Sequence, residues 1–351
     1  MAFNIEKIVR KHILALSPYS SARDEYTGKE GVFLDANENP LGSVTPQNWN
    51  RYPDPYQWQI KEKLASIKKC KPEQIFLGNG SDEPIDLLYR LLVEPATDDV
   101  IILPPTYGMY QVCAEVNNAK LTKVNLTPDY QIDLPKTLAA ITPNTKLIFV
   151  CSPNNPTGNL MKKSDIVALL ENLPNGIVLV DEAYNDFTNE PSFVNELHLY
   201  PNLVVLQTFS KAWGLASLRI GMAFADESIV KLLNKIKYPY NINGATQELL
   251  LQYIDNIDFV EKSVKTLNEN KLILQNELSK LPIVIKIHPS DANFILVQFT
   301  EAKQIFDYLI SKKTILRDRS KVILCDNCIR ISIGTEQENE LLITQLVEFQ
   351  G

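Results

Sequence analysis

The fold of this chain is decided by two neighbouring stretches, KLIFVCSPNNPTG at residues 146–158 and IVLVDEAY at residues 177–184. Each begins as a short apolar run and ends in polar residues or in a turn rich in proline and glycine. Comparable runs, separated by amphipathic stretches, occupy residues 74–77, 100–103, 203–207 and 220–224. Apolar runs that alternate with helices predict an α/β fold with a mostly parallel sheet and helices on both faces. Ligands bind beyond the carboxyl ends of such strands, so the residues after each run are the first candidates for a site.

The pattern changes near residue 243, where longer helices replace the alternating elements. Helices are expected over residues 244–254 and 259–281, followed by strand-like runs at 293–299 and 328–333 with a helix between them. Thr335 and Glu338 have the spacing of a capping box and open the last helix. We therefore expect a large domain over residues 46–250 and a smaller α+β domain over 251–351, with a connecting helix at 254–281. Residues 1–45 are interpreted as a leader that completes the smaller domain or contacts a second subunit.

The composition excludes several classes of protein. The 351 residues are 45% hydrophobic and 22% charged, as in ordinary soluble globular proteins. The net charge of −7, from 35 basic and 42 acidic residues, argues against nucleic acid as a partner. Charged residues interrupt the apolar N-terminus and no run has membrane-spanning length, so neither a signal peptide nor a membrane partner is expected. Five scattered cysteines predict reduced thiols and a cytoplasmic protein.

The sequence has too few histidines, and places them too far apart, to predict a metal site or a catalytic triad. The three histidines, His12, His198 and His288, are far apart, so no metal site and no Ser-His-Asp triad is predicted. Cys325 and Cys328 form a single CxxC, which without further ligands is interpreted as a structural loop before the last strand.

The turn GNGSDE at residues 78–83 follows the first predicted strand. Ser81 is a candidate N-cap, and Asp82 and Glu83 fall in the first helical turn. Glycines expose backbone N–H groups and the helix dipole attracts an anion, so this turn can bind a phosphate. Glu83 stands where a dinucleotide fingerprint needs its third glycine, and no Gly-Lys-Ser/Thr follows, which disfavours NAD and ATP. Taken alone, such a turn is more often only structural.

Further candidates follow the later strands. Asp181 comes directly after a buried run, where a carboxylate needs a cationic partner. Taken alone, Asp181 is better explained by a structural ion pair or a helix N-cap. Lys211, in TFSKAWGL at residues 208–215, follows another apolar run, where desolvation lowers the pKa of the amine and makes it a usable nucleophile. Arg219 can clamp a phosphate with its planar guanidinium. Asn155, in a loop fixed by prolines, can donate a hydrogen bond to a ring oxygen.

The last predicted strand carries an arginine. Alternation in CIRISI, residues 328–333, sends the isoleucines to one face and Arg330 with Ser332 to the other. A mid-strand arginine either meets an anion or lies on an exposed face, and the pattern alone leaves both open.

Together these segments resemble the fold-type I pyridoxal-phosphate (PLP) aminotransferases of the aspartate aminotransferase superfamily. The shared order is GNGSDE (78–83), PTYG (105–108), NNPTG (154–158), DEAY (181–184), SK (210–211) and RIG (219–221). Within the superfamily, SPY (17–19), LDANENP (34–40), RYPD (51–54) and PPTYGMY (104–110) resemble the histidinol-phosphate aminotransferase branch. The resemblance covers nearly the whole chain and implies a large PLP-binding domain with a mostly parallel seven-stranded sheet, plus a smaller α+β domain.

The resemblance assigns roles to single residues. Lys211 would hold PLP as a Schiff base and move the proton of the substrate's α-carbon. Asp181 would pair with the pyridinium nitrogen, and Tyr107 would stack on the ring. The remaining cofactor contacts would be Asn155 and Tyr184 to the ring oxygen, Ser81, Asp82, Ser210 and Arg219 at the phosphate, and Tyr52 to the phosphate of the partner subunit's cofactor. The last contact implies a homodimer. Glu83, in the same turn as Ser81 and Asp82, is also predicted among the cofactor-binding residues.

The same resemblance implies a substrate. Arg330 would bind a carboxylate, Arg317 lies in the same small domain, and Tyr19 and Asn37 belong to the leader that would close over the site. Two arginines suit an enzyme that accepts a phosphate monoester in one half-reaction and a dicarboxylate in the other. The implied reaction converts L-histidinol phosphate and 2-oxoglutarate to imidazole-acetol phosphate and L-glutamate, in histidine biosynthesis.

Three alternatives share the fold. A threonine-phosphate decarboxylase also binds a phosphorylated substrate. An aromatic amino-acid aminotransferase catalyses the same type of reaction with an aromatic amino acid as the amine donor. A non-catalytic regulator that binds PLP would carry an added DNA-binding domain, for which the expected domains leave no residues, and would not need the lysine, aspartate and arginine set.

Overall fold

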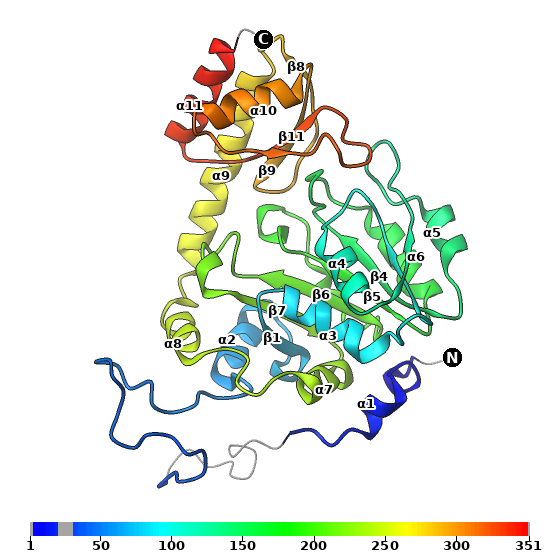
Figure 1. Cartoon of the computed structure of the whole chain (residues 1–351), viewed down its shortest axis with the longest axis vertical. Helices are drawn as coiled ribbons and strands as arrows, with labels where there is room; N and C mark the ends of the chain where they lie inside the picture. Colours follow the sequence, from blue (N-terminus) through cyan, green and yellow to red (C-terminus); the bar gives the residue numbers. More distant parts are fainter. Residues whose placement is uncertain (1–2, 20–30, 350–351) are drawn as a thin grey trace.

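The computed structural model describes residues 3–19 and 31–349, and its larger part is built on a seven-stranded sheet (Figure 1). Six of its strands run parallel, and β7 is antiparallel to both of its neighbours. In spatial order the strands are β1 (Ile75–Asn79), β7 (Ile220–Ala225), β6 (Leu203–Thr208), β5 (Ile177–Asp181), β4 (Thr145–Cys151), β2 (Asp99–Ile102) and β3 (Lys120–Lys123). The predicted α/β class with a mostly parallel seven-stranded sheet is confirmed.

Both faces of this sheet are buried, as continuous apolar runs require. Along β4, Ile148 and Val150 point into one apolar cluster, whereas Leu147 and Phe149 point into the other. The helices of this part are α2 (Trp58–Lys68), α3 (Asp82–Leu92), α4 (Met109–Val116), α5 (Leu134–Ala140), α6 (Lys163–Asn172), α7 (Glu227–Ile236) and α8 (Gly244–Tyr253). Strand β3 escaped the sequence analysis because its residues, Lys-Leu-Thr-Lys, lie half exposed at the sheet edge and form no apolar run.

The smaller part begins with the long helix α9 (Ile257–Leu278), which leads away from the large sheet (Figure 1). Its antiparallel sheet has the order β10 (Arg317–Asp318), β11 (Cys328–Ser332), β9 (Phe294–Phe299) and β8 (Val284–Ile287). Helices α9, α10 (Ala302–Ser311) and α11 (Glu336–Glu348) share one apolar cluster with Ile329 and Ile331 of β11. Helix α11 starts with the predicted capping box, in which Thr335 and Glu338 bond reciprocally.

Residues 3–15 of the leader lie against the large domain. That the leader completes the smaller domain or contacts a second subunit stays a prediction. A 3-10 helix (Ile5–Lys7) and helix α1 (Lys11–Ala15) bury Ile5, Ile8 and Val9 in the cluster beneath α3, and the backbone N–H of Arg10 donates to Leu91 O at 3.0 Å. Residues 31–53 contain no helix or strand and extend away from the body of the molecule (Figure 1). The domain boundaries themselves remain a prediction. None of the described helices has the length and apolarity needed to cross a bilayer.

Candidate active site

The side chains that follow successive strands of the large sheet converge on one cavity of about 180 Å³. They come from the turns after β1, β2, β4, β5 and β6 and from the start of β7, that is, from the carboxyl edge of the parallel strands, where ligands of such sheets bind. The cavity is lined by Ser81, Asp82, Tyr107, Cys151, Asn155, Asp181, Ala183, Tyr184, Thr208, Ser210, Lys211 and Arg219. All but Cys151, Ala183 and Thr208 were predicted as site residues.

Asp181 ends β5 at the floor of the cavity and is 3% exposed. Burial raises the pKa of its carboxyl, while a hydrogen bond from the Tyr110 hydroxyl at 2.6 Å and one from the Ala183 N–H at 3.1 Å counteract that rise. The charge of Lys211 contributes least of these effects. A carboxylate in this position is therefore short of a cation.

Tyr110 is a site residue that sequence reasoning missed. Its ring is fully buried and stacks on Phe149 with 4.6 Å between centroids, so its hydroxyl is fixed toward Asp181. The residue stands in the PPTYGMY motif, but its apolar surroundings in helix α4 resembled an ordinary core position. One signal was the residue type itself: a phenylalanine would fill the same apolar space, so a tyrosine there indicates that its hydroxyl has a hydrogen-bond partner.

Lys211 enters the cavity from the turn after β6. Desolvation lowers the pKa of its amine, the positive charge of Arg330 lowers it further, and Asp181 partly opposes both. The ammonium nitrogen lies 5.7 Å from the ring centroid of Tyr184. An amine that is neutral at lower pH than an ordinary lysine is a nucleophile and a proton carrier.

The other end of the cavity is a cradle with a positive charge. Arg219 donates to Ser210 Oγ at 3.4 Å, and its guanidinium lies 3.7 Å from a carboxylate oxygen of Asp82. Gly80 has φ of +75°, and a Cβ there would lie 2.6 Å from Arg219 Nη2. A Cβ on Gly221 would come within 2.3 Å of the Ser81 N–H nitrogen. Both glycines are therefore required for the close approach that brings the start of α3 to Arg219.

Ser81 precedes α3, as predicted, but its hydroxyl makes no capping bond to the helix. The first helical turn carries Asp82, whose carboxylate accepts a hydrogen bond from the Tyr107 hydroxyl at 3.1 Å. Glu83 turns away from the cavity: its carboxylate accepts bonds from the N–H of Asn79 and from Asn241 Nδ2. Glu83 thus supports the turn and is not among the residues that line the cavity, so its predicted contact with the cofactor stays a prediction.

Asn155 connects the cavity to the smaller domain. Its Nδ2 donates to the Tyr184 hydroxyl at 3.3 Å, and its Oδ1 accepts a bond from Arg330 Nη1 at 2.5 Å. The Arg330 guanidinium also lies 5.2 Å from the ring centroid of Phe294. Arg317 stands directly opposite Arg330 in the β10–β11 register, so the two predicted arginines are neighbours. The face of β11 that carries Arg330 meets the site, which resolves the alternative of an exposed face.

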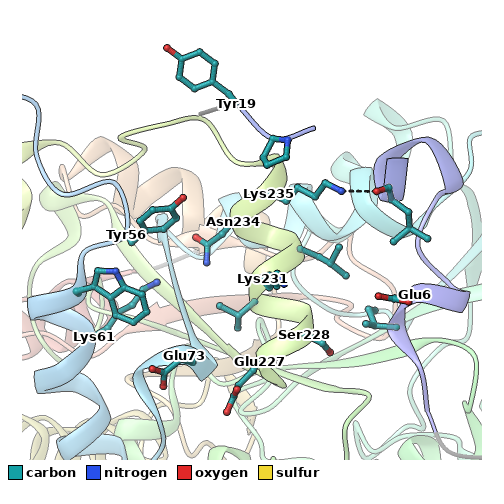
Figure 2. A pocket seen from close by; sticks show the side chains of 16 residues that line it. Glu6, Tyr19, Tyr56, Lys61, Glu73, Glu227, Ser228, Lys231, Asn234 and Lys235 are labelled. Carbon is teal, nitrogen blue, oxygen red and sulfur yellow. Dashed lines mark hydrogen bonds between the residues drawn. The ribbon is translucent and has the colours of Figure 1, made fainter. Parts of the chain in front are cut away.

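Three predicted residues lie apart from the cavity within this chain. Tyr52 stacks on Tyr240 with 4.5 Å between centroids, and with Asn37 it lines an open groove of about 530 Å³. Tyr19 is 75% exposed and borders a larger groove of about 990 Å³ between the leader, α2 and α7 (Figure 2). Within that groove Lys235 donates to Leu14 O at 2.7 Å (Figure 2). The groove is wide and open, and no buried acid, lysine and arginine meet in it as they do in the smaller cavity.

The cavity fits PLP by the chemistry of its donors. A buried carboxylate lacking a cation suits a pyridinium nitrogen, and a glycine-lined helix start beside an arginine suits a phosphate. A lysine of lowered pKa stands between them. In the described residues, no group of three or more His, Cys, Asp or Glu side chains could hold a metal ion.

Comparison with known proteins agrees with a PLP site, first through the family and then through individual relatives. The sequence model of the family described as aminotransferase class I and II matches residues 27–346, and the chain belongs to this PLP-dependent family. Within it the chain is similar to histidinol-phosphate aminotransferases: it is 52% identical to that of Cytophaga hutchinsonii and 51% identical to that of Bacteroides thetaiotaomicron, with 99% of each chain covered in both comparisons. The predicted family is confirmed.

A solved structure shares the fold. The crystal structure of histidinol-phosphate aminotransferase from Sinorhizobium meliloti in complex with pyridoxal-5'-phosphate has a TM-score of 0.79 at 23% identity, covering 97% of this chain and 96% of that one. This likeness concerns the arrangement of the elements, and it confirms the fold of the whole described chain.

Proposed function

We propose that the protein transfers the amine of L-histidinol phosphate to 2-oxoglutarate, giving imidazole-acetol phosphate and L-glutamate in histidine biosynthesis. The observation that carries the proposal is the cavity in which Lys211, Asp181 and the Arg219 cradle meet, with Arg330 of the smaller domain hydrogen-bonded to its lining residue Asn155. The relatives named above support the choice of substrate.

PLP, when bound, supplies an aromatic electron sink for the electrons released at the substrate's α-carbon. Asp181 would hold the ring nitrogen and favour its protonated form, because the buried carboxylate would gain the cation it lacks. Asn155 and Tyr184 would bind the phenolic oxygen of the ring, and Tyr107 would contact the ring. Ser81, Asp82, Ser210 and Arg219 would bind the phosphate.

Lys211 is the residue that would hold the cofactor and would move the proton of the substrate's α-carbon. The positive charge of Arg330 and the desolvated cavity both keep its amine neutral over a wider pH range than an ordinary lysine has, which favours this role. Arg330 and Arg317 receive the anionic groups of the two substrates in turn.

We also propose that the enzyme works as a homodimer. Residues 31–53 expose Val32, Leu34, Leu41 and Val44, all more than four-fifths accessible, which is unusual for so many apolar side chains in one segment. A second subunit would cover them. Tyr52 would then reach the cofactor phosphate of the partner subunit, and Tyr19 and Asn37 would close the substrate site. The five free cysteines fit a location in the cytoplasm.

Amine transfer separates this function from its rivals. The purified holoenzyme is incubated with histidinol phosphate and 2-oxoglutarate, and glutamate is measured; parallel reactions contain threonine phosphate, with carbon dioxide as the product, or phenylalanine as a competing donor. Glutamate formation with histidinol phosphate is expected to exceed that with phenylalanine at equal concentration. Release of carbon dioxide from threonine phosphate without glutamate formation would replace the proposal by the decarboxylase.

A further inference from the structure

Arg319 is an arginine of the smaller domain to which no role has been given. It follows β10 directly, and its backbone N–H donates to Cys328 O at 2.8 Å, which extends the β10–β11 pairing by one residue. Arg317 stands opposite Arg330 in that register. Because side chains alternate along strands, Arg317, Arg319 and Arg330 share one face of the sheet.

This face looks toward the active site. Arg330 reaches Asn155 of the cofactor loop, and Cys328 packs in the apolar cluster that also contains Tyr184. The opposite face carries Ile329 and Ile331 into the cluster beneath α9, α10 and α11. The three arginines therefore lie on the sheet face that meets the large domain, close to the loop that carries Asn155.

The guanidinium of Arg319 lacks a partner within the described residues. Its Nε is buried without a hydrogen bond, and no ion pair or side-chain hydrogen bond of Arg319 is formed there. Burial lowers the pKa of Arg319, and the charges of Arg330 and then Arg317 lower it further, with weaker opposition from Cys325 and Asp318. A buried donor beside two like charges is costly unless an anion completes it.

We propose that Arg319, together with Arg317, forms the subsite for the doubly charged phosphate of a phosphate-monoester substrate and sets the preference for that substrate over amino acids with a carboxylate at the same end. The inference rests on the proposed function and adds the residue that determines its selectivity. A phosphate dianion offers three acceptor oxygens and two charges to the two guanidinium groups, whereas the side-chain carboxylate of glutamate offers two oxygens and one charge. Loss of Arg319 should therefore weaken binding of the phosphate monoester more than binding of glutamate.

The test compares Arg319→Met and Arg319→Lys with the wild-type holoenzyme. Each half-reaction is followed separately by the cofactor's absorbance, with histidinol phosphate or glutamate as the amine donor, and half-saturating concentrations are determined. For Arg319→Met we expect the value for histidinol phosphate to rise about tenfold or more, and that for glutamate to rise clearly less. Arg319→Lys keeps the charge but lacks the planar guanidinium, so its half-saturating concentration for histidinol phosphate should lie between those of wild type and Arg319→Met. If the methionine variant does not fold, the lysine variant carries the same comparison.

A binding measurement that needs no turnover accompanies the kinetics. Inorganic phosphate is titrated into the PLP-loaded protein, whose cofactor phosphate site is already filled, and the shift in melting temperature is recorded. The shift should be present in wild type, reduced in both Arg319 variants and kept in Lys321→Met, which removes an exposed charge two residues away. Equal losses for the two amine donors, or an unchanged phosphate shift in Arg319→Met, would overturn the inference. If wild type binds phosphate through Arg319 but does not transaminate histidinol phosphate, the subsite stands and the proposed function fails.

Discussion

At the scale of single residues, the site depends on groups whose surroundings shift their charge equilibria in opposite directions. Burial raises the pKa of Asp181, whereas burial and Arg330 lower the pKa of Lys211. The Asp181 carboxylate is therefore stabilised by a cationic partner, whereas the Lys211 amine is more easily deprotonated than an ordinary lysine. The two side chains face one cavity, so a ligand with a basic ring nitrogen and a carbonyl group satisfies both.

Replacing Arg330 should change the pH at which Lys211 captures the cofactor. The neutral amine attacks the PLP aldehyde, so the capture rate by the cofactor-free protein rises with pH through the pKa of Lys211, and the half-rise should lie below the ordinary lysine value of 10.5. Arg330→Gln removes a positive neighbour, which stabilises the ammonium form and raises that pKa. We expect the half-rise to move to higher pH; a profile that stays in place or moves down would contradict the assigned charge coupling.

Tyr110 should act by holding Asp181. Tyr110→Phe removes the hydrogen bond that most stabilises the buried carboxylate, at a cost of about 1.5–3 kcal/mol for a bond to a charged group. PLP should then dissociate about tenfold more readily, measured by equilibrium dialysis of the holoenzyme. Tyr89→Phe is the matched control, because the buried Tyr89 hydroxyl bonds only to the backbone carbonyl of Tyr110 within the described residues. Equal cofactor loss in both variants would reduce Tyr110 to a packing role.

At the scale of elements, the site is assembled where strand ends approach one another so closely that only glycine, which has no side chain, fits at the contact. Glycines 80 and 221 make that approach between the end of β1, the start of α3 and the start of β7. The sequence placed six of the seven strands of this sheet by their apolar runs. It could not reveal Tyr110, whose role depends on a contact with Asp181 from another element. It also gave no sign that the Glu83 side chain bonds to the Asn79 N–H, because the first turn of a helix points its side chains in different directions.

Gly221→Ala should destabilise the large domain through this close approach. The added Cβ would lie 2.3 Å from the Ser81 nitrogen, a backbone atom that cannot move without shifting α3. We expect a loss of about 1–3 kcal/mol in the free energy of unfolding, as for other overpacked positions. Gly108→Ala is the comparison, since its Cβ would meet nothing within 4 Å at a φ of −67°. Urea unfolding curves of the two variants should differ by that amount, and matching curves would refute the steric argument.

At the scale of the whole molecule, the predicted leader residues Tyr19, Asn37 and Tyr52 lie away from the cavity of their own chain. Sequence patterns predicted both domains of the fold because buried strands and amphipathic helices leave local signals. The part played by the leader left no such signal, since an exposed segment has no periodicity to analyse. Its exposed apolar side chains are the ones that the proposed dimer would cover.

Mixed subunits should reveal sites shared between chains. Lys211→Ala and Tyr52→Phe subunits, each with reduced activity alone, are unfolded together and refolded as a mixture. Random pairing makes half of the dimers hybrid, and each hybrid contains one site with both residues intact, so about a quarter of wild-type activity should return. Activity equal to the average of the two parents would show that each site is built from one chain.

The central claim is that Lys211 and Asp181 serve one cofactor that accepts the amine of histidinol phosphate. A single absorbance experiment on the purified PLP-loaded protein tests it: histidinol phosphate is added without 2-oxoglutarate, and the spectrum is followed until it is stable. The absorbance of the lysine-bound cofactor should disappear in favour of that of pyridoxamine phosphate, and 2-oxoglutarate should then restore it. A spectrum unchanged by histidinol phosphate, or the same reversible change in Lys211→Ala at the wild-type rate, would contradict the account.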